Sequence, residues 1–138
     1  MLTLSDAKDI ATIGGAVVAL FALIKAVVEY GHQGAQKRAE HFVLMRKRFK
    51  ENESFRELCV LIETDDPSLK EIPFKDKRDL LGFFEEVALM TNSRLIRASV
   101  AHYMFGYYAI RCWESENFWS SVNRKSAYWT LFRDFCER

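Results

Sequence analysis

The sequence predicts an all-α protein in which an N-terminal transmembrane helix is followed by a small cytosolic helical bundle. Residues 10–28 form an apolar run whose only charged residue is Lys25. Beyond this run, apolar residues recur three and four positions apart, which is the spacing of helices that bury one face. We find no stretch in which apolar and polar residues alternate between turn signals, as they do in the strands of a sheet.

The apolar run has the length of a helix that crosses a bilayer, which needs about 20 apolar residues, with a range of roughly 17–25. Lys25 lies near its end, where a long side chain reaches the headgroups, and Tyr30 follows at the depth of an interfacial aromatic. The alternatives are a buried core helix and a cleaved signal peptide. A small domain has little interior for a helix that is apolar on every face. Asp6, Asp9 and the lack of a small-residue cleavage site disfavour a signal peptide.

The charges that flank the run predict its orientation. One lysine precedes the run, whereas the segment after it is rich in cations: Lys37, Arg38, Arg46, Lys47, Arg48 and Lys50. Lys and Arg close to a membrane helix remain in the cytoplasm. We therefore expect a single-pass membrane protein with its N-terminus outside, its C-terminal domain in the cytoplasm and the lipid bilayer as its first partner. The cations either contact anionic lipid or form an ordinary solvated helix face.

Three segments are predicted along the chain. They are a transmembrane anchor at residues 1–30, a juxtamembrane basic helix at residues 31–50 and a cytosolic helical domain at residues 51–138. The anchor helix is expected to continue through Gly31 and Gly34. Each glycine weakens a helix by roughly 1 kcal/mol relative to alanine, so this pair is the predicted hinge between membrane and cytosol.

The cytosolic domain is predicted to contain four helices. The first begins near Ser54, where Ser54-x-x-Glu57 forms a capping box, and ends at the turn residues 64–68. The next two cover about 76–91 and 98–116, and Asn123 caps a short last helix. The last two helices are expected to bury mainly large side chains: Val100, Met104, Tyr107, Tyr108, Ile110, Trp113, Tyr128, Leu131, Phe132 and Phe135.

Composition and motifs exclude several classes of function. With a net charge of +1 over 138 residues, the chain lacks the cation excess of a dedicated duplex DNA binder. Its three cysteines form no C-x-x-C pair and lack a histidine at ligand spacing, so we expect no metal and no cofactor. No phosphate-loop, dinucleotide, hydrolase or metalloprotease motif occurs. One of the adjacent residues Glu85 and Glu86 is expected to form a structural ion pair with an arginine. His102 has no serine or cysteine nucleophile in a recognisable motif. We assign no catalytic residue and expect no enzyme.

Arginines and tryptophans in the second half of the chain form the predicted ligand site: Arg94, Arg97, Arg111, Trp113 and Trp119. A guanidinium binds a phosphate through two hydrogen bonds, and an indole stacks on a base with about 1–3 kcal/mol. The group therefore predicts a small anionic ligand of the nucleotide second-messenger type. The alternative is that Arg111 pairs with a carboxylate such as Glu85, while the tryptophans fill the core.

Small residues recur on one face of the predicted anchor: Gly15, Ala19, Ala22 and Ala26. Small-x-x-x-small faces let membrane helices approach closely. The pattern predicts packing between anchors, and hence a homo-oligomer.

Residues 82–88 (GFFEEVA), Leu95-Ile96 and residues 105–114 (FGYYAIRCWE) resemble a known bacterial family. It is a widespread domain of unknown function found in short membrane proteins with a single membrane helix. In its members, a basic helix and a segment similar to residues 49–56 follow the membrane helix. An FFEEV helix and an FGxxIxRxWE helix come next. The family usually has an acidic residue after Leu-Ile, where this chain has Arg97. The resemblance spans nearly the whole chain and implies an α-helical cytosolic domain on a protein of the bacterial inner membrane, without implying an activity.

Two functions of different classes follow as expectations. The first is a ligand-gated membrane effector, whose cytosolic helices oligomerise, sense the anionic ligand and perturb the membrane through the hinge. Effectors of bacterial antiviral defence share this layout, which is an analogy of architecture. The second is a membrane-tethered interaction module, which recruits a partner protein and binds no ligand.

Overall fold

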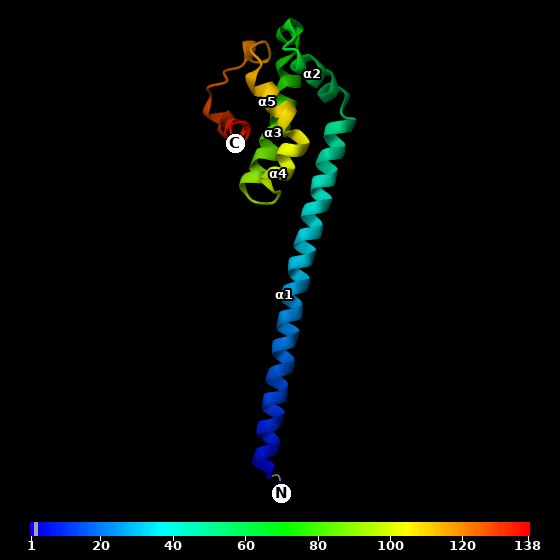
Figure 1. Ribbon diagram of the computed structural model, residues 1–138, viewed down its shortest axis with the longest axis vertical. Helices are drawn as coiled ribbons and strands as arrows, with labels where there is room; N and C mark the ends of the chain where they lie inside the picture. Colours follow the sequence, from blue (N-terminus) through cyan, green and yellow to red (C-terminus); the bar gives the residue numbers. More distant parts are fainter. Residues whose placement is uncertain (2) are drawn as a thin grey trace. The chain divides into compact units, whose positions relative to one another are not determined.

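Helices form all of the regular structure in the residues that this computed structural model describes, which are Met1 and residues 3–138. The all-α prediction is therefore confirmed for these residues. They form two compact units, Met1–Glu40 and His41–Arg138. α1 (Leu4–Glu51) passes from the first unit into the second, which contains all the other helices (Figure 1).

The first unit consists of the start of α1 and the residues before it. Thr3 and Asp6 cap the helix reciprocally, because the Thr3 N–H donates to Asp6 Oδ2 at 2.9 Å and the Asp6 N–H donates to Thr3 Oγ1 at 3.2 Å. Every residue from 10 to 28 is exposed within this unit. By length and composition, α1 can cross a membrane. The helix also continues without interruption through Gly31 and Gly34, as predicted.

The second unit contains the end of α1 and a set of shorter helices. The longer ones are α2 (Glu53–Glu63), α3 (Phe74–Asn92), α5 (Tyr107–Glu114) and α6 (Thr130–Cys136). Short helical segments join them: η1 (Pro67–Glu71), α4 (Ala98–Ala101), the π-helical turn η2 (His102–Gly106), η3 (Phe118–Ser121) and η4 (Ala127–Trp129). α4, η2 and α5 form one unbroken helical stretch.

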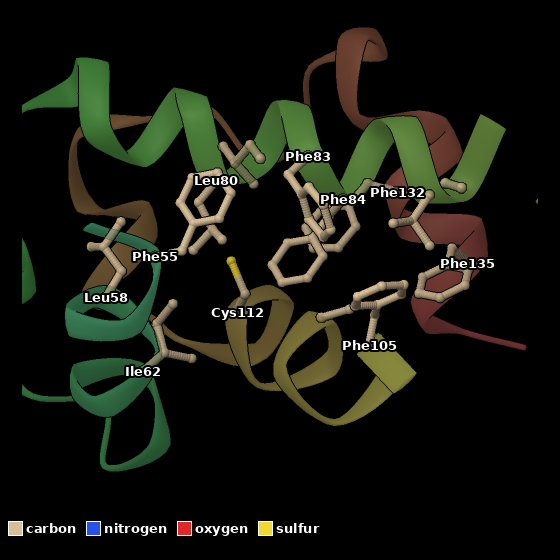
Figure 2. Close-up of a cluster of buried hydrophobic side chains, with 14 of the residues drawn as sticks. Phe55, Leu58, Ile62, Leu80, Phe83, Phe84, Phe105, Cys112, Phe132 and Phe135 are labelled. Carbon is tan, nitrogen blue, oxygen red and sulfur yellow. The ribbon is translucent and has the colours of Figure 1, made fainter. Parts of the chain in front are cut away.

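The core of the second unit is rich in phenylalanine and is centred on α3. Figure 2 shows α3 lying along a cluster of buried side chains. α2 contributes side chains at one end of this cluster, and α6 contributes side chains at the other end. The rings of Phe84 and Phe132 stack with centroids 5.4 Å apart, and those of Phe83 and Phe105 meet edge to face at 5.3 Å. All four side chains are fully buried. Aromatic pairs of this kind contribute about 0.5–1.5 kcal/mol beyond the area that they bury.

Two predicted helix caps are wrong. α2 is capped by Asn52, whose Oδ1 accepts from the Phe55 N–H at 3.1 Å, so Ser54 lies inside the helix. Asn123 accepts from the Lys125 N–H at 3.1 Å and makes a local turn, while Ser126 caps the helical segment that leads into α6. In both places several capping residues lie close together in the sequence, and the path of the chain selects one of them.

Three of the large side chains that were expected in the core are exposed. Val100, Tyr107 and Tyr128 are 38%, 55% and 87% exposed. The α4–η2–α5 stretch instead buries a face that includes small residues, namely Ala101, Gly106, Ala109 and Cys112. Small side chains let this stretch approach its neighbours closely, and the tyrosines turn outward with their hydroxyls in water.

Candidate anion-binding pocket

The last turns of α1 share a pocket of about 390 Å³ with α2, η2 and α5. All of these segments belong to the second unit. Three cations line the pocket, Arg46 and Lys50 from α1 and Arg56 from α2. The remaining lining residues are Phe49, Phe55, Cys59, Val60, Met104, Phe105 and Tyr108. We refer to the three exposed cations as the rim and to the remaining lining residues, of which Phe55, Cys59 and Phe105 are buried, as the floor.

The rim cations are exposed and have few carboxylate partners. Arg46 and Lys50 are one helical turn apart on α1, so they project from the same side of the helix. Neither forms an ion pair within the described part of the chain, and Arg56 has only a long contact of 3.7 Å with Glu53 on its own helix. No carboxylate is among the lining residues. The rim thus presents unneutralised positive charge to an anion.

Phe49 holds the end of α1 against the rest of the pocket. Its ring lies 5.5 Å from that of Phe105, 5.9 Å from that of Tyr108 and 6.2 Å from that of Phe55, between ring centroids. Met45, one turn earlier, is buried. These contacts hold the part of α1 that supplies Arg46 and Lys50 to the pocket lining.

The two groups on the floor that can ionise remain neutral near physiological pH. Burial, with a smaller contribution from the nearby Glu63, raises the pKa of the Cys59 thiol to about 12. Burial also raises the pKa of Tyr108, again with an added contribution from Glu63. Neither group therefore adds a negative charge to the pocket, and the carboxylate that acts on both of them, Glu63, is not among the lining residues.

The π-helical turn supplies Met104 and Phe105 to the pocket. Single π turns inside α-helices often occur at functional sites. His102, at the start of the turn, stacks on Phe135 with ring centroids 4.3 Å apart, and its buried Nε2 has no hydrogen-bond partner in the described chain. A Cβ on Gly106 would lie 3.2 Å from His102 Nδ1, so glycine lets the turn close over the imidazole.

The two tryptophans of the sequence-predicted ligand site lie together. The rings of Trp113 and Trp119 meet edge to face at 5.4 Å. Trp119 is buried and its indole N–H donates to the Cys112 carbonyl at 2.9 Å. Trp113 is half-buried, and Arg124 lies 5.7 Å from its ring and donates to its carbonyl at 2.9 Å. A wider cavity beside Trp113, of about 490 Å³, carries both signs of charge, including Glu114 and Glu116.

The three arginines of that predicted site are exposed and lie on separate segments. Arg94 follows α3 with a φ of 57°, Arg97 directly precedes α4, and the Arg111 guanidinium on α5 lies 5.7 Å from the Tyr107 ring. Within the described residues, no ion pair, hydrogen bond or cation–ring contact joins them to either tryptophan. A shared ligand site of these residues stays a prediction. From the sequence, Arg46 and Lys50 are predicted only as part of the basic juxtamembrane cluster and not as pocket residues. Their i, i+4 spacing around Phe49 is nevertheless visible in the sequence.

The adjacent glutamates of α3 take separate partners. Glu86 Oε2 accepts from Arg48 at 2.9 Å, which confirms an ion pair between this pair of glutamates and an arginine. Glu85 accepts from the Phe132 N–H at 3.0 Å and so holds α6 to α3. Burial raises the pKa of Glu85, and the Phe132 hydrogen bond partly offsets this. The alternative pairing of Glu85 with Arg111 is wrong, because no ion pair joins these two residues in the described part of the chain.

The anchor residues singled out in the sequence lie in the exposed part of α1. Gly15, Ala19, Ala22 and Ala26 are all exposed within the first unit. A Cβ at Gly15 or Gly31 would meet nothing within 4 Å, and one at Gly34 would meet only the Arg38 side chain, at 3.4 Å. Helix packing by the first group and hinge motion at Gly31 and Gly34 stay predictions.

Comparisons with family models, with curated proteins and with solved structures find no match to this chain. The resemblance to the bacterial family of single-helix membrane proteins therefore stays a prediction.

Proposed function

We propose that this chain is a single-pass membrane protein whose helical unit senses a small anionic ligand and passes the binding event to the membrane helix. One observation carries the proposal. Arg46 and Lys50 of the pocket lie on α1, the same uninterrupted helix that contains the apolar run at residues 10–28. A ligand held by these cations is therefore held by the helix that would respond to it.

The contacts of the pocket suggest how binding acts on α1. An anion between the α1 cations and Arg56 of α2 would draw the two helices together, because each charge-assisted contact contributes about 1.5–3 kcal/mol. A ligand shifts a conformational equilibrium by its difference in affinity for the two states. The state in which the end of α1 packs through Met45 and Phe49 is the one with the assembled pocket. Ligand binding would favour that state.

Within this proposal, the protein acts as an oligomeric effector with its N-terminus outside and its helical unit in the cytoplasm of a bacterium. Membrane perturbation in antiviral defence rests on the analogy of layout drawn from the sequence, and a nucleotide-type messenger rests on the sequence-predicted group of arginines and tryptophans. Support for the orientation comes from the cations that follow the apolar run. The absence of a recognisable catalytic motif supports a binding role over an enzymatic one.

The test uses the full chain in lipid discs and in dye-loaded liposomes. A panel of nucleoside monophosphates, linear and cyclic oligonucleotides and short carboxylates and phosphates is titrated by calorimetry. We expect at least one anion to bind and to release dye. Each of the two contacts is worth roughly tenfold to a hundredfold, so Arg46→Glu combined with Lys50→Glu should weaken its binding by at least about a hundredfold. Lys47→Glu is the matched control, because Lys47 is exposed on the same helix and does not line the pocket.

Two further outcomes would either move the ligand site to other residues or end the sensor proposal. A ligand whose binding depends on Arg94, Arg97 or Arg111, and not on Arg46 and Lys50, would move the sensor site to the residues predicted from the sequence. If folded wild-type protein bound none of the panel at high micromolar concentration, the sensor proposal would be abandoned.

The membrane-tethered interaction module is the second candidate, favoured by exposed side chains near the start of α4. Leu95 is 47%, Val100 38% and Tyr103 89% exposed. Exposed apolar and aromatic side chains are one feature of protein-interaction sites. A partner that co-purifies with the full chain should be lost with Leu95→Asp and kept with Leu44→Asp, a change at a more exposed site on α1. Loss with both variants, or with neither, would remove this candidate.

A further inference from the structure

We propose that the ligand of the pocket is an amphipathic anion, with one negatively charged head group and an apolar body the size of a short acyl chain or a single ring system. This inference rests on the proposed function and narrows its ligand. It is carried by the composition of the pocket lining, in which three exposed cations accompany seven residues whose side chains are apolar except for one thiol and one phenol.

The rim fits a single compact head group. Arg46 and Lys50 are one turn apart on α1, and Arg56 faces the same pocket from α2. Arg46 and Lys50 form no ion pair in the described part of the chain, so an incoming anion displaces no carboxylate from them. A phosphate or carboxylate can accept from guanidinium and ammonium donors together.

The floor fits an apolar body better than a nucleobase. Its side chains are Phe49, Phe55, Cys59, Val60, Met104, Phe105 and Tyr108, whose polar atoms are one thiol and one phenol. A base brings several donors and acceptors, and those left unpaired on such a floor lower its affinity. An acyl chain or a simple aromatic ring has no such groups and gains from burial.

The size of the pocket supports the same conclusion. Its volume of about 390 Å³ is near the lower end of the range for small-molecule sites, roughly 300–1,000 Å³. That space suits one chain or one ring system and not several bases.

The experiment titrates decyl phosphate into the full chain in discs of zwitterionic lipid, with calorimetry and with empty discs subtracted. We expect saturable binding to wild type and to Lys47→Glu, and binding at least about a hundredfold weaker with Arg46→Glu and Lys50→Glu combined. Lengthening the alkyl chain should tighten the site-specific component by about fourfold per methylene until the pocket is full.

A second pair of variants tests the apolar floor without disturbing the core. Val60 is 64% exposed and lines the pocket, whereas Leu44 is 62% exposed and does not. Val60→Asn should weaken decyl phosphate binding several-fold, and Leu44→Asn should leave it unchanged. Equal binding by both variants would contradict an apolar contact at the floor.

The remaining outcomes separate this inference from the proposed function. Decanol that binds as tightly as decyl phosphate would refute the role of the charged rim. Nucleotides that bind through Arg46 and Lys50, while decyl phosphate does not, would overturn the amphipathic ligand and leave the sensor proposal in place. Binding that disappears in discs of phosphatidylglycerol would show that a bilayer lipid occupies the site, against a free ligand. If no anion distinguished wild type from the double variant, both proposals would fail.

Discussion

Lys77 is an individual residue whose burial works against the stability of the fold. It is fully buried near the start of α3, beneath η3. Its ammonium lies 5.6 Å from the Phe118 ring centroid and 3.5 Å from Ser121 Oγ, and it forms no ion pair in the described residues. Desolvation lowers the pKa of Lys77, because a charge removed from water with weak partners costs free energy.

Lys77→Met should therefore stabilise the protein. We expect the free energy of unfolding at pH 7 to rise by about 1–3 kcal/mol, the usual cost of a buried polar group with poor partners. Chemical denaturation of the full chain, followed by circular dichroism, measures it. Lys75→Met is the control, since Lys75 is exposed on the same helix and should show no change.

The pH dependence of this difference has a definite sign. Between the lowered folded pKa of Lys77 and its ordinary value of 10.5, the unfolded chain binds more protons than the folded chain. The Lys77 contribution to stability therefore improves as pH rises through that window. The advantage of Lys77→Met should shrink towards pH 10.5, while the raised pKa values of Tyr108 and the cysteines affect both proteins alike. A constant difference across pH would contradict a lowered pKa.

Among the helices, α2 shows how neighbouring capping residues compete. Asn52 and Ser54 can each begin a helix, and the sequence pattern favoured Ser54 because Glu57 follows three residues later. α1 runs to Glu51, so only Asn52 is left between the two helices, and its side chain accepts from the Phe55 N–H. The start of α2 is thus determined by where α1 ends.

This assignment can be tested by comparing two alanine variants. Asn52→Ala removes the capping bond and should lower the free energy of unfolding by about 1 kcal/mol. Ser54→Ala falls inside the helix, where alanine is favourable, and should change it by no more than a few tenths. Thermal melts of the full chain in detergent would resolve the two. If Ser54→Ala were the more damaging change, the cap would be at Ser54.

At the level of the complete chain, the apolar part of α1 and the helical unit have different environments. Every residue from 10 to 28 is exposed within its own unit, whereas the second unit buries a full aromatic core. Apolar side chains exposed on all faces of a helix need lipid or other helices around them. This contrast underlies the proposed anchoring and assembly of the protein.

The proposed orientation predicts the position of the C-terminus. A reporter fused after Arg138 should be active in the cytoplasm of a bacterial host, because the cations between residues 37 and 50 resist translocation. Alkaline phosphatase and a fluorescent protein, fused in parallel, give opposite signals and so control for expression. A periplasmic signal from the fusion would reverse the orientation.

The small-residue face predicts how anchors associate. Gly15 has open space beside it within one copy of the chain, so Gly15→Leu leaves the single helix intact while preventing close approach of a second one. Cross-linking in membranes should give less oligomer for this variant and an unchanged amount for Val17→Leu. The same yield from both would indicate that assembly, if it occurs, is driven elsewhere.

Much of the helical architecture follows from local patterns in the sequence. The apolar run, the continuation of α1 through both glycines, the extent of α3 and the buried stripe of α2 depend on composition and spacing, which are properties of consecutive residues. The ion pair of α3 with an arginine was also foreseen, although its partner is Arg48.

The buried face of the α4–η2–α5 stretch and the pocket depend on which helices pack against one another. Ala101, Ala109 and Cys112 are buried because they allow close packing, while the larger Val100 and Tyr107 remain exposed. The pocket unites residues near position 50 with residues near position 105, and no local pattern relates segments so distant in the chain. Arg46 and Lys50 could be recognised as cations from the sequence. Their association with Arg56 and an apolar floor arises from the tertiary packing of α1, α2 and η2, because spatial proximity between distant segments is set by the shared core.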